Sequence, residues 1–160
     1  LTGLLFLIAC TPSLEKRLQK KMILHPQSMQ EVEHNRILQY AINHDLDVKS
    51  TPSGIFYVIE NEGKGPKPTR FATITAHHES RLLLTGKTFD STYEKGEPLT
   101  FKLDDVIVGW QESIPLLSKG GKGTFIIPSR LAYGDEQVGP VPPNSVLVFE
   151  IELLDFNNRS

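Results

Sequence analysis

The sequence predicts an α+β fold in which an antiparallel sheet wraps around one short helix, with another helix appended on the N-terminal side. Short runs rich in β-branched and aromatic residues recur between glycine and proline turn signals from residue 55 to residue 156, which is typical of strands. In the stretch VIVGWQES at residues 106–113, a β-branched run ends at Gly109, and Trp110, the only tryptophan, follows. A strand is expected to end there and a short helix to begin. Several strands and one internal helix can bury their apolar faces against each other in two layers.

Residues 1–9, LTGLLFLIA, are expected to belong to a signal peptide, because this apolar run is too short to span a bilayer. Residues 7–10 (LIAC) resemble the lipobox of bacterial lipoproteins. The resemblance implies that Cys10 is lipidated and anchors the protein in the bacterial cell envelope, on the periplasmic side. Thr11, rather than aspartate, follows the cysteine, which under one bacterial sorting rule favours the outer membrane. The alternative for Cys10 is a buried thiol in an apolar helix, but Pro12 would end such a helix at once.

Residues 10–27 are predicted to form the lipidated cysteine and a tether, because the segment is charged and carries few apolar residues before Pro26. A membrane-surface amphipathic helix is the alternative, although such a helix needs a broad apolar face. The next segment, residues 28–50, is predicted to hold an N-terminal helix and a linker. Ser28 and Glu31 fit a capping box, and apolar side chains recur at helical spacing at Met29, Val32, Ile37, Tyr40 and Ala41.

Residues 51–157 are predicted to form the main domain. Strands are expected at 55–60, 71–78, 81–84, 101–103, 123–128 and 146–156, with a loop at 63–68 and a turn at Thr85 and Gly86. Pro115 falls in the short helix after Trp110. It should shorten that helix, because proline cannot donate a backbone hydrogen bond.

Six short motifs in this domain occur in one order: FDS at 89–91, PLTF at 98–101, VIVGW at 106–110, LAYG at 131–134, VPPN at 141–144 and VLVFEIELL at 146–154. Together they resemble the signature of the FKBP-type peptidyl-prolyl isomerases, and the resemblance covers residues 54–156. The order of helix, TPSG turn at 51–54 and strand at 55–59 also resembles lipoproteins associated with gliding motility.

The resemblance implies an enzyme that interconverts the cis and trans forms of X–Pro bonds in proline-containing polypeptides, and so assists the folding of envelope proteins. The barrier is about 18–20 kcal/mol, because twisting the bond destroys amide resonance. No bond is made or broken, so no cofactor is expected. The alternative is a binding module that holds proline-containing segments as a chaperone or assembly factor without turnover.

The family's site falls on an aromatic cleft in this sequence, with Trp110 as its floor. The resemblance implies that Asp90 lies beside the twisting bond and that the Tyr133 hydroxyl donates to a substrate carbonyl. The expected catalytic residues are Asp90, Tyr133, Phe89 and Phe149, and the expected substrate-binding residues are Trp110, Ile107, Val106, Phe101, Leu99, Val141 and His78. For Asp90 the alternative is a cap on the turn that follows it.

His78 is expected to replace a tyrosine that family members carry in the cleft, if His77 and His78 align with the family's His-Tyr. An ungapped alignment places Glu79 there instead, but two neighbouring carboxylates in an apolar cleft repel each other. Adjacent strand residues face opposite ways, and the sequence does not show which of the two histidines points inward. The same hypothesis predicts that Asp90 raises the pKa of His78. The missing tyrosine, and Leu99 in place of an aromatic residue, predict that macrolide binding is weakened.

Composition excludes several other functions. The 160 residues carry a net charge of −2 with both signs interspersed, so nucleic-acid partners are not expected. One cysteine rules out an internal disulfide, and no residue pattern predicts a metal site. The stretch GGKGT at 120–124 lacks the Walker spacing and is expected to be a turn.

Overall fold

The computed structural model describes residues 12–158. The predicted signal peptide and the predicted lipidation at Cys10 lie outside these residues. Within the described range, no helix is long and apolar enough to cross a membrane.

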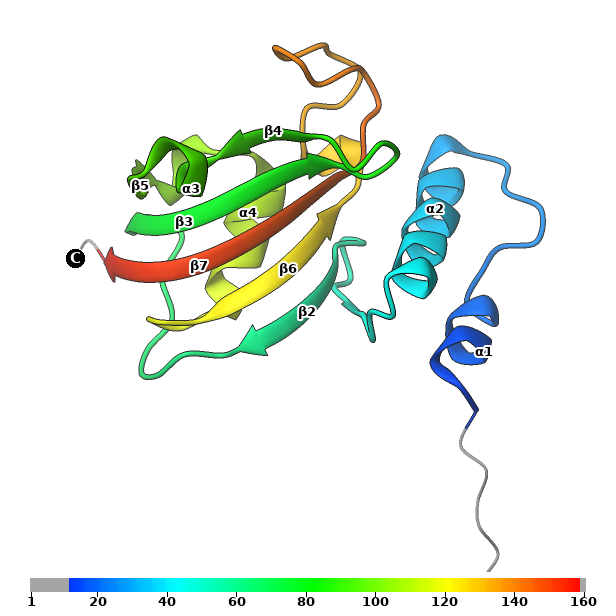
Figure 1. Cartoon of the computed structure of the whole chain (residues 1–160), viewed down its shortest axis with the longest axis horizontal. Helices are drawn as coiled ribbons and strands as arrows, with labels where there is room; N and C mark the ends of the chain where they lie inside the picture. Colours follow the sequence, from blue (N-terminus) through cyan, green and yellow to red (C-terminus); the bar gives the residue numbers. More distant parts are fainter. Residues whose placement is uncertain (1–11, 159–160) are drawn as a thin grey trace, which may run out of the picture.

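A seven-stranded antiparallel sheet organises the molecule, and it confirms the predicted fold class (Figure 1). Six strands follow the spatial order β1-β2-β6-β7-β3-β4, and β5 pairs with β3 beyond this path. The strands are β1 (Lys49–Ser50), β2 (Phe56–Asn61), β3 (Thr73–Leu82), β4 (Thr88–Ser91), β5 (Leu99–Lys102), β6 (Lys122–Ile127) and β7 (Leu147–Asn157).

The inner face of the sheet wraps around α4 (Val108–Ser113), the short helix that contains Trp110 (Figure 1). Alternate residues of β6 and β7 point to this face, as the two-residue period of a strand requires. They form the inner core with side chains of the helical segments, including Ile74, Leu103, Trp110, Ile114, Phe125, Ile127, Leu147, Phe149 and Ile151. Pro115 lies where α4 gives way to the 3-10 helix Ile114–Leu116, so the predicted shortening of the helix is observed.

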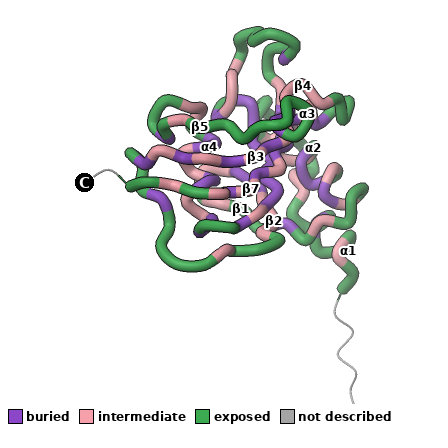
Figure 2. The backbone as a smooth tube through the Cα atoms, turned by 60° about the vertical axis from the view of Figure 1, so that its left-hand side comes forward, coloured by how far each residue is buried: buried purple, intermediate pink, exposed green. Residues whose placement is uncertain are grey.

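Helix α2 (Met29–Asn43) covers the opposite face of the sheet at one end, where β2, β6 and β7 also bury their outward side chains (Figures 1 and 2). Its capping box is present: Ser28 accepts from the Glu31 amide, and Glu31 accepts from the Ser28 amide. The residues buried between α2 and the sheet form a second group, the outer core, which includes Ile37, Leu38, Ala41, Phe56, Ile126 and Val148.

Residues 12–27 differ from the predicted tether, because α1 (Leu14–Gln19) forms and docks on α2. Leu18 is the buried residue of α1: it is 1% exposed and lies in the outer core. The loop after α1 is held too, since the Asn35 amide accepts from the backbone N–H of Ile23 at 2.8 Å and donates to its carbonyl at 2.7 Å. Leu14 and Met22 also pack against the outer core, whereas Leu24 is 88% exposed. The inward packing of α1 argues against the membrane-surface helix.

The predicted strands at 71–78 and 81–84 are wrong as separate elements, because β3 runs unbroken from Thr73 to Leu82. It pairs along its whole length with β7, which keeps it extended. The chain then turns at residues 83–85 and returns as β4, a strand that the sequence did not indicate. The short helix α3 (Thr92–Lys95) follows β4 directly.

Candidate active site

A cleft of about 320 Å³ opens on the inner side of the sheet, where β3, β4 and β7 approach the start of α4. Most of the expected site residues meet there, although they are far apart in the sequence. The cleft is lined by His78, Ser80, Phe89, Asp90, Leu99, Asp105, Val106, Ile107, Trp110, Tyr133 and Phe149.

Trp110 forms the floor of this cleft and is 6% exposed. The rings of Phe149 and His78 meet it edge to face, with centroids 5.4 Å and 5.1 Å away. This is the preferred geometry for aromatic pairs. These contacts hold the indole in one orientation.

Gly109 allows α4 to lie close enough to the sheet for this arrangement. A Cβ atom at this position would lie 2.5 Å from a side-chain methyl of Ile127 and 3.1 Å from the carbonyl oxygen of Leu131. Both distances are below ordinary contact. The glycine before the tryptophan is therefore a packing requirement of the cleft.

A β-bulge in β4 brings two consecutive residues, Phe89 and Asp90, to the same cleft. Ser80 of β3 pairs with Asp90, but the next residue, Arg81, pairs with Thr88, so Phe89 is the extra residue. In a regular strand these side chains would face opposite ways, and a bulge re-aims one of them. Asp90 does not cap the turn that follows, because Ser91 caps α3 by accepting from the Glu94 amide. The capping alternative is therefore wrong.

His78, and not Glu79, points into the cleft. Along β3 the buried residues alternate through Ala76, His78 and Ser80, while Glu79 lies on the opposite face, where it pairs with Arg81 at 2.6 Å. Thr92, which the sequence did not single out, fixes the His78 backbone. Its hydroxyl accepts from the His78 N–H at 2.8 Å and donates to the His78 carbonyl at 3.1 Å.

The His78 imidazole hydrogen-bonds to Asp90, with Nε2 and Oδ2 3.1 Å apart. Burial lowers the pKa of His78 below 6.5, and the opposing effect of Asp90 is smaller. Asp90 does act to raise this pKa, as expected, but the net shift is downward, because the ring is only 2% exposed and its charged form loses its hydration. His78 is therefore neutral near pH 7 and donates through Nε2.

Asp90 stays ionised beside this neutral ring. Burial acts to raise the pKa of Asp90, but hydrogen bonds from Lys95 and His78 outweigh it and lower the pKa below 3.8. Lys95 reaches the other carboxylate oxygen, Oδ1, at 2.5 Å. The carboxylate is thus held by one donor from α3 and one from β3.

Tyr133 faces Asp90 from the loop between β6 and β7, and its side chain is half-buried. Burial, together with the negative charge of Asp90, raises the pKa of Tyr133, so the hydroxyl keeps its proton. A protonated hydroxyl can donate a hydrogen bond to a carbonyl in the cleft.

Two expected residues do not line the cleft. Phe101 packs against the Trp110 ring, with centroids 5.3 Å apart, and so supports the floor from the side. Val141 is 2% exposed and belongs to the inner core, where it anchors its loop. In that loop the more exposed valine is Val138, which pairs with Val141 through two backbone hydrogen bonds. Conversely, Ser80 and Asp105 line the cleft without any sequence signal that pointed to them.

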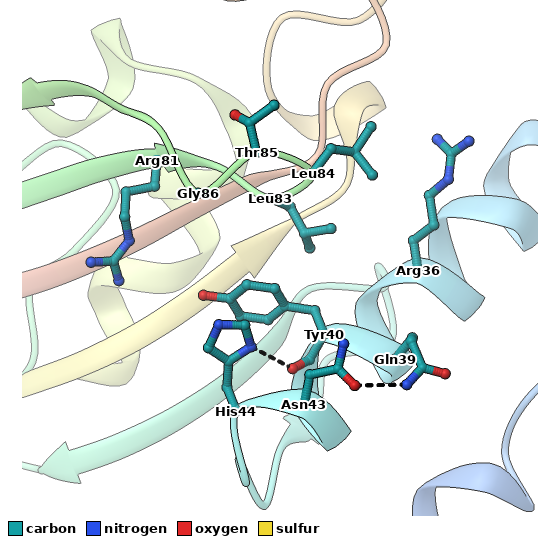
Figure 3. A pocket seen from close by; sticks show the side chains of 10 residues that line it. All are labelled: Arg36, Gln39, Tyr40, Asn43, His44, Arg81, Leu83, Leu84, Thr85 and Gly86. Carbon is teal, nitrogen blue, oxygen red and sulfur yellow. Dashed lines mark hydrogen bonds between the residues drawn. The ribbon is translucent and has the colours of Figure 1, made fainter.

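A larger groove of about 660 Å³ lies between α2 and the turn that joins β3 to β4 (Figure 3). Its α2 side is mostly polar: the rings of Tyr40 and His44 stack 3.9 Å apart, and Gln39 donates to Asn43. This lining lacks the aromatic enclosure of the smaller cleft. Among residues 12–158, no group of three or more histidine, cysteine, aspartate or glutamate side chains is arranged to hold a metal ion.

Comparison with known proteins agrees with this geometry. The sequence model of the family described as FKBP-type peptidyl-prolyl cis-trans isomerase matches residues 65–154. A probable FKBP-type peptidyl-prolyl cis-trans isomerase from Haemophilus influenzae is 46% identical over 115 residues, which are 71% of this chain and 47% of that protein. The isomerase FkpA from Escherichia coli is 45% identical over 108 residues, 68% of this chain and 40% of that protein. The chain thus spans less than half the length of these relatives.

Solved structures show the same fold. The crystal structure of FkpA from Escherichia coli aligns with a TM-score of 0.72 and 35% identity, covering 90% of this chain and 64% of that one. A peptidyl-prolyl cis-trans isomerase from Pseudomonas syringae aligns with a TM-score of 0.67 and 31% identity, covering 84% of this chain and 100% of that one. The family match covers more than half of the sequence and includes every residue that lines the cleft. The chain therefore belongs to the FKBP-type peptidyl-prolyl cis-trans isomerase family.

Proposed function

We propose that the protein is a peptidyl-prolyl cis-trans isomerase that binds the X–Pro bond of polypeptide substrates in the cleft above Trp110. The observation that carries this proposal is the convergence of an aromatic floor, an ionised Asp90 and a protonated Tyr133 on one cavity. Family membership supports the same reaction.

The cleft would catalyse by fitting the twisted amide better than either planar form. The twisted carbonyl is less polarised than the planar one, so it loses less hydration when the Trp110, Phe149 and Phe89 rings enclose it. In this proposal Tyr133 donates to a substrate carbonyl, and Asp90 lies beside the rotating bond. His78 fills the place of the family's tyrosine and holds Asp90 through Nε2.

Apolar side chains around the cleft suggest which substrates fit best. Leu99 is 42% exposed at the edge of the cavity, and Val108, next to the cleft-lining Ile107, is 48% exposed. Exposed apolar residues beside a pocket favour apolar neighbours of the proline. The same surface favours the second candidate, a chaperone or assembly factor that holds proline-containing segments without turnover.

The macrolide interaction is proposed to be weak. Leu99 offers a small aliphatic side chain in place of an aromatic wall, and the imidazole of His78 replaces a phenol. A ligand that fills the family's aromatic cleft would therefore lose contact area on two sides, and buried apolar area contributes about 25 cal/mol per Å².

A protease-coupled assay on a proline-containing peptide, with and without a macrolide, tests the proposed activity. Isomerisation should be much faster than the uncatalysed reaction, which takes tens of seconds. Inhibition of this protein should require far more macrolide than inhibition of a family member with a complete aromatic cleft. Full peptide binding with no gain in rate would reverse the choice in favour of the chaperone.

For the location, we propose a lipoprotein of the bacterial envelope anchored through Cys10 and facing the periplasm, with the outer membrane as the preferred site. Support comes from the lipobox-like residues 7–10 and from the order of helix, turn and strand that resembles gliding-motility lipoproteins. Cys10→Ser should release the protein into the soluble fraction or leave an uncleaved precursor. A variant that is still processed and membrane-bound would contradict lipidation.

A further inference from the structure

A buried carboxylate connects the N-terminal helix to the loop that carries Tyr133. Glu33 lies on α2, yet it is only 2% exposed and points away from solvent into the main domain. Oε2 accepts from the Ser129 N–H at 3.0 Å, and Oε1 accepts from the Ser129 hydroxyl at 2.5 Å. Ser129 is itself 5% exposed, so this pair is shielded from water.

Ser129 needs this partner because of the residue before it. It begins the 3-10 helix Ser129–Leu131, whose N-cap residue is Pro128 and makes no side-chain capping bond. The first amides of a helix have no partner inside the helix and require an acceptor from elsewhere. Here the acceptor comes from a residue 96 positions earlier in the sequence.

The same serine controls the backbone on both sides of Tyr133. Its carbonyl accepts from the Ala132 N–H at 2.9 Å and from the Gly134 N–H at 2.8 Å. Gly134 has a positive φ of 63°, and its carbonyl accepts from the Asn144 N–H at 2.7 Å. The short turn around Tyr133 is therefore built on Ser129, with Glu33 behind it.

We propose that Glu33 is a positioning residue for the Tyr133 loop, so that α2 is part of the apparatus that sets the cleft geometry. Glu33 touches neither the cleft nor a substrate; it acts through Ser129. The inference rests on the proposed function in so far as Tyr133 contacts the substrate, but the structural connection exists independently of activity.

Two variants of similar size separate the hydrogen bonds from the packing. In Glu33→Gln, the amide oxygen can accept from the Ser129 N–H and the amide nitrogen can donate to its hydroxyl. In Glu33→Leu, the side chain fills the space but satisfies neither group. Both residues favour helix, so α2 itself should be preserved. Ile126→Val serves as a control, because it weakens the outer core without touching Ser129.

Two measurements are made on each folded variant of the full chain: the hydrogen-exchange rates of the Ala132 and Gly134 amides together with the Tyr133 ring resonances, and kcat/KM for a proline peptide. Glu33→Leu should speed exchange at both amides and shift the Tyr133 ring. It should also lower kcat/KM about tenfold, since small misplacements of a contacting group reduce rates strongly. Glu33→Gln and Ile126→Val should remain close to wild type in both measurements.

The exchange data decide the positioning role even if the wild-type protein proves not to be an isomerase, so the two proposals fail separately. Unchanged exchange and ring resonances in Glu33→Leu would overturn the inference. So would an equal loss of kcat/KM in Glu33→Gln or Ile126→Val, because a general loss of stability would then explain the effect. Shifted resonances with full activity would also overturn it.

Discussion

At the scale of single residues, the wall of the cleft combines a neutral imidazole with an ionised carboxylate. His78 is buried deeply enough that its pKa is lowered, whereas Asp90 keeps its charge through two donors. The pair therefore carries one negative charge, on Asp90, and His78 adds no charge to the apolar cleft near pH 7. Both groups lose their native protonation states on acidification, but in different pH ranges.

We predict that wild-type kcat/KM is flat around pH 7 and falls only as pH drops below the ordinary histidine value of about 6.5. The free energy of unfolding should decrease over the same range. The folded pKa of His78 lies below its unfolded value, so the unfolded chain takes up the proton first. Asp90, whose folded pKa lies below 3.8, adds a separate loss only as pH falls further.

Chemical denaturation between pH 4.5 and 8, for wild type and His78→Gln, checks this prediction. Glutamine can still donate to Asp90 but does not titrate. In the mutant, the decrease in the free energy of unfolding near and below pH 6.5 should therefore be absent. If the mutant shows the same decrease in the free energy of unfolding, another titrating group is responsible for it.

The residue scale also shows where sequence reasoning succeeded. Trp110, Phe89, Asp90, Tyr133 and Phe149 were placed in one cleft through their motifs, and the structure brings them together. The role of His78 was harder, because the sequence alone does not state which face of β3 is inward. Its pKa was predicted in the wrong direction, since the degree of burial is a property of the whole packed cleft.

At the scale of elements, the position of α4 depends on the absence of a side chain at Gly109. We predict that Gly109→Ala lowers the free energy of unfolding by about 1–3 kcal/mol, because the added methyl overlaps Ile127 and forces the helix outward. Denaturant titration measures this loss. Val108→Ala on the same helix is the control: Val108 is 48% exposed, and the change should stay within about 0.5 kcal/mol.

An equal effect of the two substitutions would contradict the close approach of α4 to the sheet. A further sign of displacement should be a change in Trp110 fluorescence in Gly109→Ala alone, since the indole would leave its contacts with Phe149 and His78.

Elements that have strong local signals were predictable, and those that depend on pairing were not. The capping box of Ser28 and Glu31 marks the start of α2, and the alternating pattern marks β7. In contrast, β4 is a short strand with a bulge at Phe89, and it forms because its backbone can pair with β3. A helix at α1 was predicted only as the membrane-surface alternative, because its docking depends on tertiary contacts: Leu18 is buried in the outer core, and Arg17 pairs with Asp47.

At the scale of the whole molecule, the two cores share one sheet. Neighbouring residues of β6 point in opposite directions: Phe125 and Ile127 enter the inner core, and Ile126 enters the outer core under α2. Damage to the outer core should therefore lower the free energy of unfolding of the whole sheet. The N-terminal helices and the isomerase fold are expected to unfold as one unit.

We predict that Leu38→Ala, at a position that is 0% exposed, costs about 2–5 kcal/mol. The transitions followed by Trp110 fluorescence and by far-ultraviolet circular dichroism should shift together. Leu84→Ala, at a position that is 68% exposed, should change neither. A separate early transition in circular dichroism, with tryptophan fluorescence unchanged, would show that α2 unfolds independently.

The most direct test of the central claim is nuclear magnetic resonance exchange spectroscopy on a peptide that contains one Leu–Pro bond. A small amount of wild-type protein should produce cis–trans exchange cross-peaks at mixing times far shorter than the uncatalysed tens of seconds. Trp110→Leu, if it remains folded, should reduce the exchange rate roughly tenfold or more at the same concentration, because the floor that fits the twisted amide is lost. Peptide resonances that shift on binding while no exchange appears, or exchange that is unchanged in Trp110→Leu, would contradict catalysis in this cleft.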